Sequence, residues 1–271
     1  MTATKPKNNA AKTPASFDRN HMMGSVAATL DLLELFVQNN TNTLQFKDFV
    51  KGTGRPKSSV HRMLATLLNK DFIVQDDLTR KYSLTLKLWR LGLPALEQHD
   101  VSFVARPYLK ELMQTTDETV HLAVSTGDGN VVYIAKFESQ RSIRVQTQLG
   151  GAVPSYCTAT GRSILANDAR LWEAVKKMKV NKRTENTEIN LGKLAGILQQ
   201  IRDTGYAVTL GEMHSEMGGV AAPIFDHDGN VVGAFGVAIP LFRMTEELVE
   251  KSIVEVLTTA KKITNAMSHT E

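Results

Sequence analysis

Residues 54–68 read GRPKSSVHRMLATLL, and this stretch decides the fold of the N-terminal third of the chain. Its apolar residues recur at the spacing of one helical face, and they are Val60, Met63, Leu64, Leu67 and Leu68. The opposite face carries cations and hydroxyls but no acid, and its residues are Lys57, Ser58, His61, Arg62 and Ala65. Pro56 has no N–H to lose and pre-sets φ, so it suits the first turn of this helix. A helix that is apolar on one side and basic on the other can lie against an acidic polymer, and DNA is the obvious candidate.

Length and composition indicate an ordinary globular protein. A chain of 271 residues suggests about two domains, and the hydrophobic fraction of 42% is sufficient for real cores. No apolar run reaches the roughly 18 residues of a membrane span, and we expect no membrane partner. The N-terminal residues lack an apolar stretch, so no secretory signal is expected. The single cysteine, Cys157, excludes an internal disulfide and a multi-cysteine zinc site, and a cytoplasmic location is expected.

The net charge of +4 is unevenly distributed along the chain. Residues 1–24 carry a net charge of +3, residues 25–92 of +4, and the remainder of −3. This asymmetry is typical of a nucleic-acid module joined to a neutral or acidic domain. The alternative is a chance imbalance among solvated faces.

The N-terminal third is predicted to be a tail followed by three helices. Residues 1–23 are polar, and we expect a disordered basic tail. A first helix is expected after Gly24, with Ser25 as its N-cap. Its predicted inward stripe is Val26, Leu30, Leu33 and Phe36, with Leu32 alongside. A short helix then places Phe46, Phe49 and Val50 inward, and residues 52–54 form the turn into the basic helix. Three helices joined in this way form a helix-turn-helix.

A hairpin is predicted directly after the third helix. Residues 72–75 and 81–84 are short β-prone runs on either side of a polar, charged turn. In this position the hairpin would be a wing, and Arg80 and Lys81 lie near its tip, within reach of a phosphate. We therefore predict a winged helix-turn-helix DNA-binding domain over residues 24–85.

The rest of the chain is predicted to be a linker and an α+β domain. Residues 86–103 read as a helical linker, weakened at Gly92 and Pro94. Over residues 104–271, strands fall in two clusters with helices between them, which argues for an antiparallel sheet. The expected strands are 119–124, 131–137, 143–146, 206–210, 219–225 and 231–239.

The sequence gives little support for a catalytic or metal-ligating role of any residue. Cys157 has no compelling histidine partner, so a buried structural cysteine is the better interpretation. His214, His227 and Asp228 match no metal-ligand spacing, and loop surface explains them. We predict no catalytic residue, no metal and no cofactor.

Four stretches of the chain form a distinctive series, namely GRPKSSVHRML (54–64), DFIV to YSL (71–84), PSYCTATGRSILA (154–166), and GYA with GGVAAPIFD (205–226). Together, in this order, they resemble the IclR family of bacterial transcriptional regulators. The first is similar to the family's Gly-x-Pro-Lys-Ser-Thr-Val-x-Arg-Leu-Leu, and the resemblance covers roughly residues 24–265. It implies a winged helix-turn-helix, a helical linker and a GAF-like effector domain of 104–271. It also implies a homodimer or homotetramer on a partly palindromic DNA operator, under the control of a small molecule.

The resemblance assigns roles to the basic helix and the wing. Ser58, Ser59 and the first amides of the helix suit phosphate oxygens. Lys57, His61 and Arg62 are long enough to read base edges. Arg55, Arg80 and Lys81 are better placed for backbone phosphates. The alternative is a solvated basic face that contacts nothing.

The resemblance also indicates an effector site. Members of the family that bind small oxo-acids use a Gly-Ala pair, an Asp, a Cys and two Ser. The matching positions here are Ala159, Thr160, Thr209, Gly219, Gly236 and Ala238. The acid, the thiol and both serines are absent, so we expect a larger and less polar ligand than glyoxylate or pyruvate, such as an aromatic acid. The alternative is that Gly236 and Ala238 merely pack the sheet.

We therefore expect a ligand-responsive transcription factor and not an enzyme. Effector binding would change the spacing of two recognition helices in a dimer. The rival hypothesis is an enzyme or small-molecule sensor whose N-terminal domain mediates protein contacts. The basic face of residues 57–62 discriminates between the two, because only the regulator needs it for DNA binding.

Overall fold

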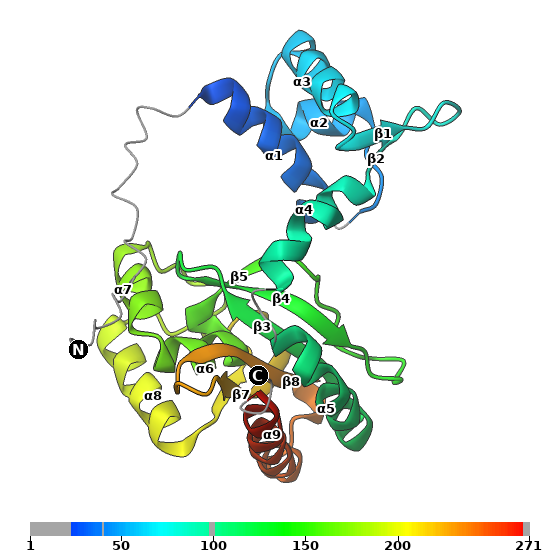
Figure 1. Ribbon diagram of the computed structural model, residues 1–271. Coiled ribbons are helices and arrows are strands. Elements are labelled where there is room, and N and C mark those ends of the chain that lie inside the picture. The colour runs from blue at the N-terminus through cyan, green and yellow to red at the C-terminus, as the bar shows by residue number, and fades with distance from the viewer. Residues whose placement is uncertain (1–22, 40, 98–100, 268–271) are drawn as a thin grey trace, which may run out of the picture. The chain divides into compact units, whose positions relative to one another are not determined.

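The computed structural model describes residues 23–39, 41–97 and 101–267. The predicted tail therefore lies outside the described residues, apart from Met23. The chain divides into two compact units, Met1–Leu88 and Trp89–Glu271 (Figure 1). No helix in the described ranges is long and apolar enough to cross a membrane.

The first unit consists of three helices and a two-stranded hairpin. Its elements are α1 (Gly24–Gln38), α2 (Phe46–Thr53), α3 (Lys57–Asn69), β1 (Ile73–Gln75) and β2 (Tyr82–Leu84). The strands pair antiparallel, as the hairpin prediction requires. Phe49 lies at the centre of the core, with its ring edge-on to Phe36 at 5.7 Å and to Tyr82 at 5.6 Å. These contacts join α1, α2 and the hairpin into one core.

The predicted apolar stripe of α3 packs inward. Val60, Met63, Leu64 and Leu67 are buried, and Leu68 is half-buried against the same core. Pro56 differs from the prediction by one position, because it is the N-cap and the helix begins at Lys57. The turn that precedes it depends on Gly54, whose φ of 63° lies in the left-handed region. The Gly54 N–H donates to the Val50 carbonyl at 3.0 Å and closes α2.

The predicted inward stripe of α1 is partly wrong. Val26 and Leu30 are exposed, whereas Ala28, Leu32, Leu35 and Phe36 are buried. Ser25 is not the cap, because the helix begins at Gly24 with Met23 in the N-cap position. The helix carries apolar residues on two faces, and contact with α2 and α3 selects the face with Ala28, since a small residue allows close packing.

The second unit is built on a six-stranded antiparallel sheet. A helix, α4 (Leu86–Glu97), crosses the boundary between the units and runs through Gly92 and Pro94. The other helices are α5 (Val101–Thr116), α6 (Ala159–Asn167), α7 (Ala169–Lys177), α8 (Leu191–Thr204) and α9 (Glu246–Met267). The strands are β3 (Thr119–Ser125), β4 (Asn130–Phe137), β5 (Ala152–Pro154), β6 (Ala207–Leu210), β7 (Met217–Phe225) and β8 (Val231–Pro240). Their order is β5-β4-β3-β8-β7-β6, so β3 and β8 join two hairpins at the centre. The predicted α+β class with an antiparallel sheet is confirmed.

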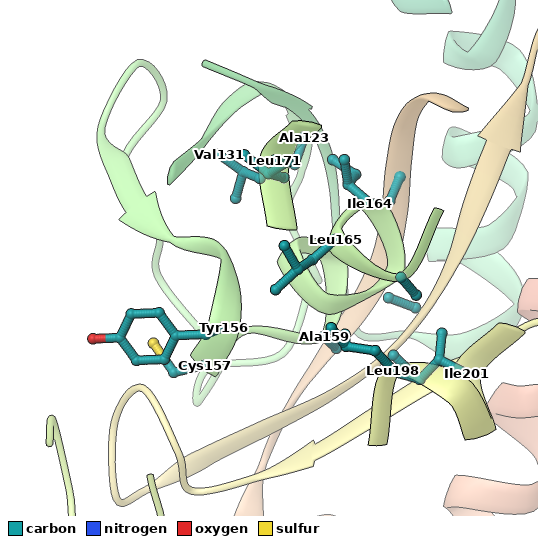
Figure 2. Packing of buried hydrophobic residues seen from close by; sticks show 14 of the residues in the cluster. Ala123, Val131, Tyr156, Cys157, Ala159, Ile164, Leu165, Leu171, Leu198 and Ile201 are labelled. Atoms are coloured by element: carbon teal, nitrogen blue, oxygen red, sulfur yellow. The ribbon is translucent and has the colours of Figure 1, made fainter. Parts of the chain in front are cut away.

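Each face of the sheet has its own hydrophobic core. On one face, Val120, Leu122 and Val124 of β3 pack with α5 and α9. On the other face, Ala123 packs with a cluster drawn from α6, α7 and α8. Figure 2 shows part of this second cluster, including Ile164 and Leu165 of α6 with Leu198 and Ile201 of α8. Alternation along β3 therefore separates a structural face from the face that carries the candidate effector positions.

The strand predicted at 143–146 does not form. These residues lie in an irregular loop between β4 and β5, and the third strand is Ala152–Pro154. Side chains hold the loop instead of a ladder, because Lys136 Nζ donates to the Thr147 carbonyl at 3.0 Å and Arg144 pairs with Glu138 at 3.3 Å. The alternating pattern of Ile143 and Val145 reflects one exposed and one buried side chain, without a partner strand.

Candidate DNA-binding surface and effector site

The outer face of α3 is exposed and rich in cations. Lys57, Ser58, Ser59, His61 and Arg62 are all exposed, as is Arg55 in the preceding turn. The first turn of the helix carries no acidic residue, and no ion pair among the described residues engages Arg55, Lys57 or Arg62. This face is therefore free to meet an anionic surface.

The start of α3 adds hydrogen-bond donors to this face. The Pro56 carbonyl accepts from the N–H groups of Ser59 and Val60 at 3.0 and 3.1 Å. The N–H groups of Lys57 and Ser58 precede these and have no partner within the helix. With the two serine hydroxyls, they form a set of donors at the positive end of the helix dipole, which suits a phosphate oxygen.

His61 and Arg62 differ in their freedom to move. The His61 ring packs edge-on to Phe46 of α2, with ring centroids 6.4 Å apart. Arg62 has no such contact, and its carbonyl accepts from the Thr66 hydroxyl at 2.9 Å within the helix. The Arg62 side chain therefore lacks the restraint that holds His61 beside α2.

The wing presents its cations on a fixed turn. The Asp76 carboxylate accepts from the Thr79 N–H at 2.6 Å and from the Thr79 hydroxyl at 2.7 Å, and these bonds lower the pKa of Asp76. Arg80 has a φ of 56°, and its N–H donates to the Asp76 carbonyl at 2.9 Å. Arg80 is exposed and Lys81 half-buried. Hydrogen bonds within the turn thus set the direction of the wing tip.

The second unit brings the six predicted effector positions together. Thr209 pairs with Gly219, Gly219 pairs with Ala238, and Gly236 precedes Ala238 by two residues on the same face. A Cβ added at Gly219 would lie 3.7 Å from the Ala159 Cβ, so the start of α6 covers this part of the sheet. Ala238 is half-buried, and the other five positions are buried.

The start of α6 carries unsatisfied polar groups. The Thr158 hydroxyl caps the helix by accepting from the Gly161 N–H at 3.1 Å, and the Arg162 N–H donates to the Thr158 carbonyl at 2.9 Å. The N–H groups of Ala159 and Thr160 remain without partners in the helix. The hydroxyls of Thr160 and Ser163 are buried and have no hydrogen-bond partner. Buried hydroxyls in this state indicate a place for a water molecule or a polar ligand.

Two aromatic residues on the same face were not predicted from the sequence. His121 is 3% exposed and lies opposite Gly236 in the β3–β8 ladder. Its ring packs against Tyr133 at 4.9 Å, and its Nε2 atom is hydrogen-bonded to the Thr147 hydroxyl. Burial, with a smaller contribution from the Lys136 ammonium, lowers the pKa of His121 to about 3. Polar residues in an otherwise apolar strand were the only sequence signal for this pair.

Tyr133 connects His121 to the start of α6. Burial raises the pKa of the Tyr133 phenol, and the nearby hydroxyls of Thr160 and Thr158 oppose that shift. The Thr160 hydroxyl, which makes no hydrogen bond of ordinary length, is thus close enough to the Tyr133 phenol to stabilise its charged form. One aromatic side chain spans from the imidazole on β3 to the helix start above β7.

A buried ion pair holds α6 against the loop after β6. The Arg162 side chain is 2% exposed, donates to the Tyr156 carbonyl at 2.7 Å and binds the Glu212 carboxylate with both terminal nitrogens. Burial raises the pKa of Glu212, and the Arg162 guanidinium opposes this shift. The loop beyond Glu212 brings the Met213 Sδ to 3.5 Å from the Cys157 Sγ. Arg162 therefore fixes the helix that carries Thr160.

Cys157 and the surface histidines show no catalytic arrangement. Burial raises the pKa of the Cys157 thiol to about 12, which keeps it protonated at neutral pH. His214 and His227 are exposed, and His227 lies 3.5 Å from Asp228. In the described part of the chain, no three His, Cys, Asp or Glu side chains gather as they would around a metal ion.

Comparison with known proteins gives matches over both units. The family described as "IclR helix-turn-helix domain" matches residues 25–77, and "Bacterial transcriptional regulator IclR C-terminal" matches residues 93–265. The HTH-type transcriptional regulator KdgR of Escherichia coli K12 is 32% identical over 215 residues, which are 79% of this chain and 81% of KdgR.

Solved structures show the same fold. An IclR transcriptional regulator from Alicyclobacillus acidocaldarius aligns with a TM-score of 0.76 at 25% identity, covering 92% of this chain and 100% of that one. An IclR homolog from Microbacterium hydrocarbonoxydans, complexed with 4-hydroxybenzoate, aligns with a TM-score of 0.75 at 21% identity, covering 90% of this chain and 99% of that one.

Proposed function

The chain belongs to the IclR family of bacterial transcriptional regulators, and on that premise we propose a role for its DNA-binding surface and for its effector site. It is a DNA-binding regulator with a ligand-binding C-terminal domain. In our proposal, α3 reads a double-stranded operator, and an aromatic organic acid bound beneath the start of α6 alters that binding. The protein acts as a homodimer or homotetramer, so that a change in one pair of domains alters the spacing of two recognition helices.

The observation that carries the DNA assignment is the unpaired cationic face of α3. Lys57, His61 and Arg62 are exposed on one side of the helix, and we assign base reading to them. Arg62 lacks the ring contact that restrains His61 and carries a guanidinium, so it is the main candidate for a bidentate contact with guanine. Phosphate contacts are assigned to Arg55, Ser58, Ser59, Arg80 and Lys81, which border this face or lie on the wing.

The test compares Arg62→Ala with Arg80→Ala on duplexes selected from a random pool by the wild-type protein. Arg62→Ala should weaken the selected sequence by about 1–3 kcal/mol and relax the preference at one position. Arg80→Ala should weaken all duplexes alike and reduce the salt slope by about 0.9. Lys251→Ala, an exposed cation on α9, is the control with the same loss of charge. If Arg62→Ala binds as Lys251→Ala does, the assignment of base reading is wrong.

The effector assignment depends on the unsatisfied groups at the start of α6. The Thr160 hydroxyl and the free amides of Ala159 and Thr160 are donors for a carboxylate, at the positive end of a helix. The floor below them consists of Gly219 and Ala238, which offer no charge to a compact oxo-acid. This donor set above an apolar floor supports an acid with an apolar body. The structural neighbour from Microbacterium hydrocarbonoxydans is complexed with such a compound, 4-hydroxybenzoate.

Calorimetry with benzoate and glyoxylate tests this assignment. Benzoate should bind, and Thr160→Val should weaken it about tenfold or more, because a hydrogen bond to a charged group is lost without loss of volume. Thr115→Val, on the exposed face of α5, is the matched control. Tight binding of glyoxylate without benzoate would show that the ligand class is wrong. Unchanged benzoate binding in Thr160→Val would show that the site is wrong.

A further inference from the structure

The tip of the wing carries an apolar side chain that contacts almost nothing. Leu78 is 94% exposed, the highest value among the large hydrophobic side chains of the described residues. The wing consists of β1, β2 and the connecting residues 76–81, and its loop projects from the three helices of the first unit (Figure 1). A single exposed leucine is not unusual in itself. The loop that carries Leu78, however, is held in one conformation.

Hydrogen bonds close the tip of the wing. The Asp76 N–H donates to the Lys81 carbonyl, and the Arg80 N–H donates to the Asp76 carbonyl, both at 2.9 Å. The Asp76 carboxylate also accepts from the N–H and the hydroxyl of Thr79, at 2.6 and 2.7 Å. Leu78 therefore stands on a preorganised turn, so its burial against a partner costs little backbone freedom.

The base of the wing is joined to α3 and to the core of the first unit. The Phe72 N–H donates to the Leu67 carbonyl of α3 at 2.9 Å, and Tyr82 exchanges two backbone hydrogen bonds with Leu44 at 2.8 and 3.0 Å. The Tyr82 ring also packs on Phe49 in the core. The position of the tip relative to α3 is therefore fixed within the unit. When α3 lies in a major groove, the wing beside it meets either the phosphates that border that groove or the minor groove beyond them.

The charges of the tip favour a contact with bases over a contact with phosphates alone. Residues 76–81 contain two acids, Asp76 and Asp77, and two cations, Arg80 and Lys81, so the turn has no net charge. Asp77 is exposed, and its carboxylate opposes the close approach of a phosphate. An apolar side chain gains nothing from a phosphate, but leucine is one of the residues that proteins insert between base steps from the minor groove.

We propose that the wing inserts Leu78 into the minor groove next to the major groove that α3 reads, where it wedges apart two stacked bases and kinks the operator. This inference rests on the proposed DNA-binding function and adds a deformation of the DNA to it. A kink costs least at a flexible pyrimidine–purine step such as TA or CA. The operator should therefore prefer such a step at a position that α3 does not touch. Leu78 is a specificity-determining residue in this proposal, and Arg80 contacts the phosphates beside it.

The experiment uses the duplex that the wild-type protein selects from a random pool, with the fluorescent base aminopurine replacing one adenine at a time. The fluorescence of this base increases when it is unstacked. Binding of the wild type should raise it at a TA or CA step outside the α3 contact, and dyes at the duplex ends should report a bend. Leu78→Ser should abolish both signals and weaken binding about tenfold or more, because the wedge is lost. Leu78→Met should retain both signals. Leu210→Ser, the same change as Leu78→Ser at an exposed leucine of the second unit, is the control and should behave as the wild type does.

A further variant tests whether the tip of the wing lies against DNA at all. Asp77→Asn should tighten binding to every duplex, since it removes a charge that repels the phosphates. Unchanged binding by Asp77→Asn overturns the inference. Tighter binding without unstacking of any base also overturns it, because the tip would then touch the backbone alone. Both results leave the assignment of base reading to α3 intact, since Arg62→Ala tests that separately. If the wild type selects no sequence from the pool, the proposed function fails as well.

Discussion

The buried imidazole of His121 predicts a specific loss of stability in mild acid. Its pKa in the folded protein is about 3, against 6.5 for an ordinary histidine, so the unfolded chain binds the proton first as the pH falls. The stability that the neutral imidazole provides is fully present above pH 6.5 and is lost progressively between 6.5 and 3. From these two values, His121 alone should reduce the free energy of unfolding by about 2 kcal/mol between pH 7 and pH 5.

Urea unfolding followed by tryptophan fluorescence measures this loss of stability in the second compact unit of the chain. The chain has two tryptophans, Trp89 and Trp172, and both belong to the second unit, which also contains His121. Wild type and His121→Phe are compared at pH 7, 6 and 5. Other groups also titrate, among them Glu212, whose raised pKa acts in the opposite direction, so only the difference between the two proteins is used. The wild type should lose about 2 kcal/mol more than the variant. Equal losses in the two proteins would refute the argument, because His121 would then titrate normally in the folded state.

Three further predictions concern packing in the second unit. Gly236→Ser should lower the free energy of unfolding, measured in urea, by roughly 1–3 kcal/mol, because a Cβ there would lie 2.8 Å from the Ala221 Cβ. If the variant is as stable as the wild type, β7 and β8 can move apart without cost and the reasoning is wrong. Arg162→Met should cost about 3 kcal/mol by the same measurement, since it leaves the Glu212 carboxylate without its partner, and a neutral effect would mean that water solvates this carboxylate. Cys157 should react with a disulfide reagent far more slowly in the native protein than in urea, given its burial and its pKa of about 12; rapid native labelling would contradict the burial.

The features predicted well from the sequence are those with a local cause. The amphipathic period of α3 determines both its inward stripe and its cationic face, because each depends on residues within four positions of one another. The same logic failed for α1, which has two apolar faces, since only its partners decide which face is buried. It failed again at 143–146, where alternation exists without a neighbouring strand. A strand needs a partner, and the partner is not visible in the local pattern.

The candidate effector site shows the same division. The resemblance supplied six positions, and the ladder register brings them together although they come from four different elements. It did not supply His121 or Tyr133, because their significance depends on β3 lying beside both β4 and β8. That juxtaposition comes from a topology in which β3 and β8 are more than a hundred residues apart in the chain.

Gly219 and Gly236 of the effector site differ in whether their lack of a side chain bears on the size of the ligand. A Cβ at Gly236 would collide with Ala221 at 2.8 Å, so the close approach of β7 and β8 accounts for a glycine there, whatever the ligand is. A Cβ at Gly219 would instead lie 3.7 Å from the Ala159 Cβ, an ordinary contact, and 3.1 Å from the Val237 carbonyl oxygen, a tighter contact that requires a small movement of the backbone. A side chain at this position would therefore extend toward the start of α6, where the unsatisfied donors lie. Only Gly219 and Ala238 therefore bear on the size of the ligand, because the close approach of β7 and β8 already explains Gly236.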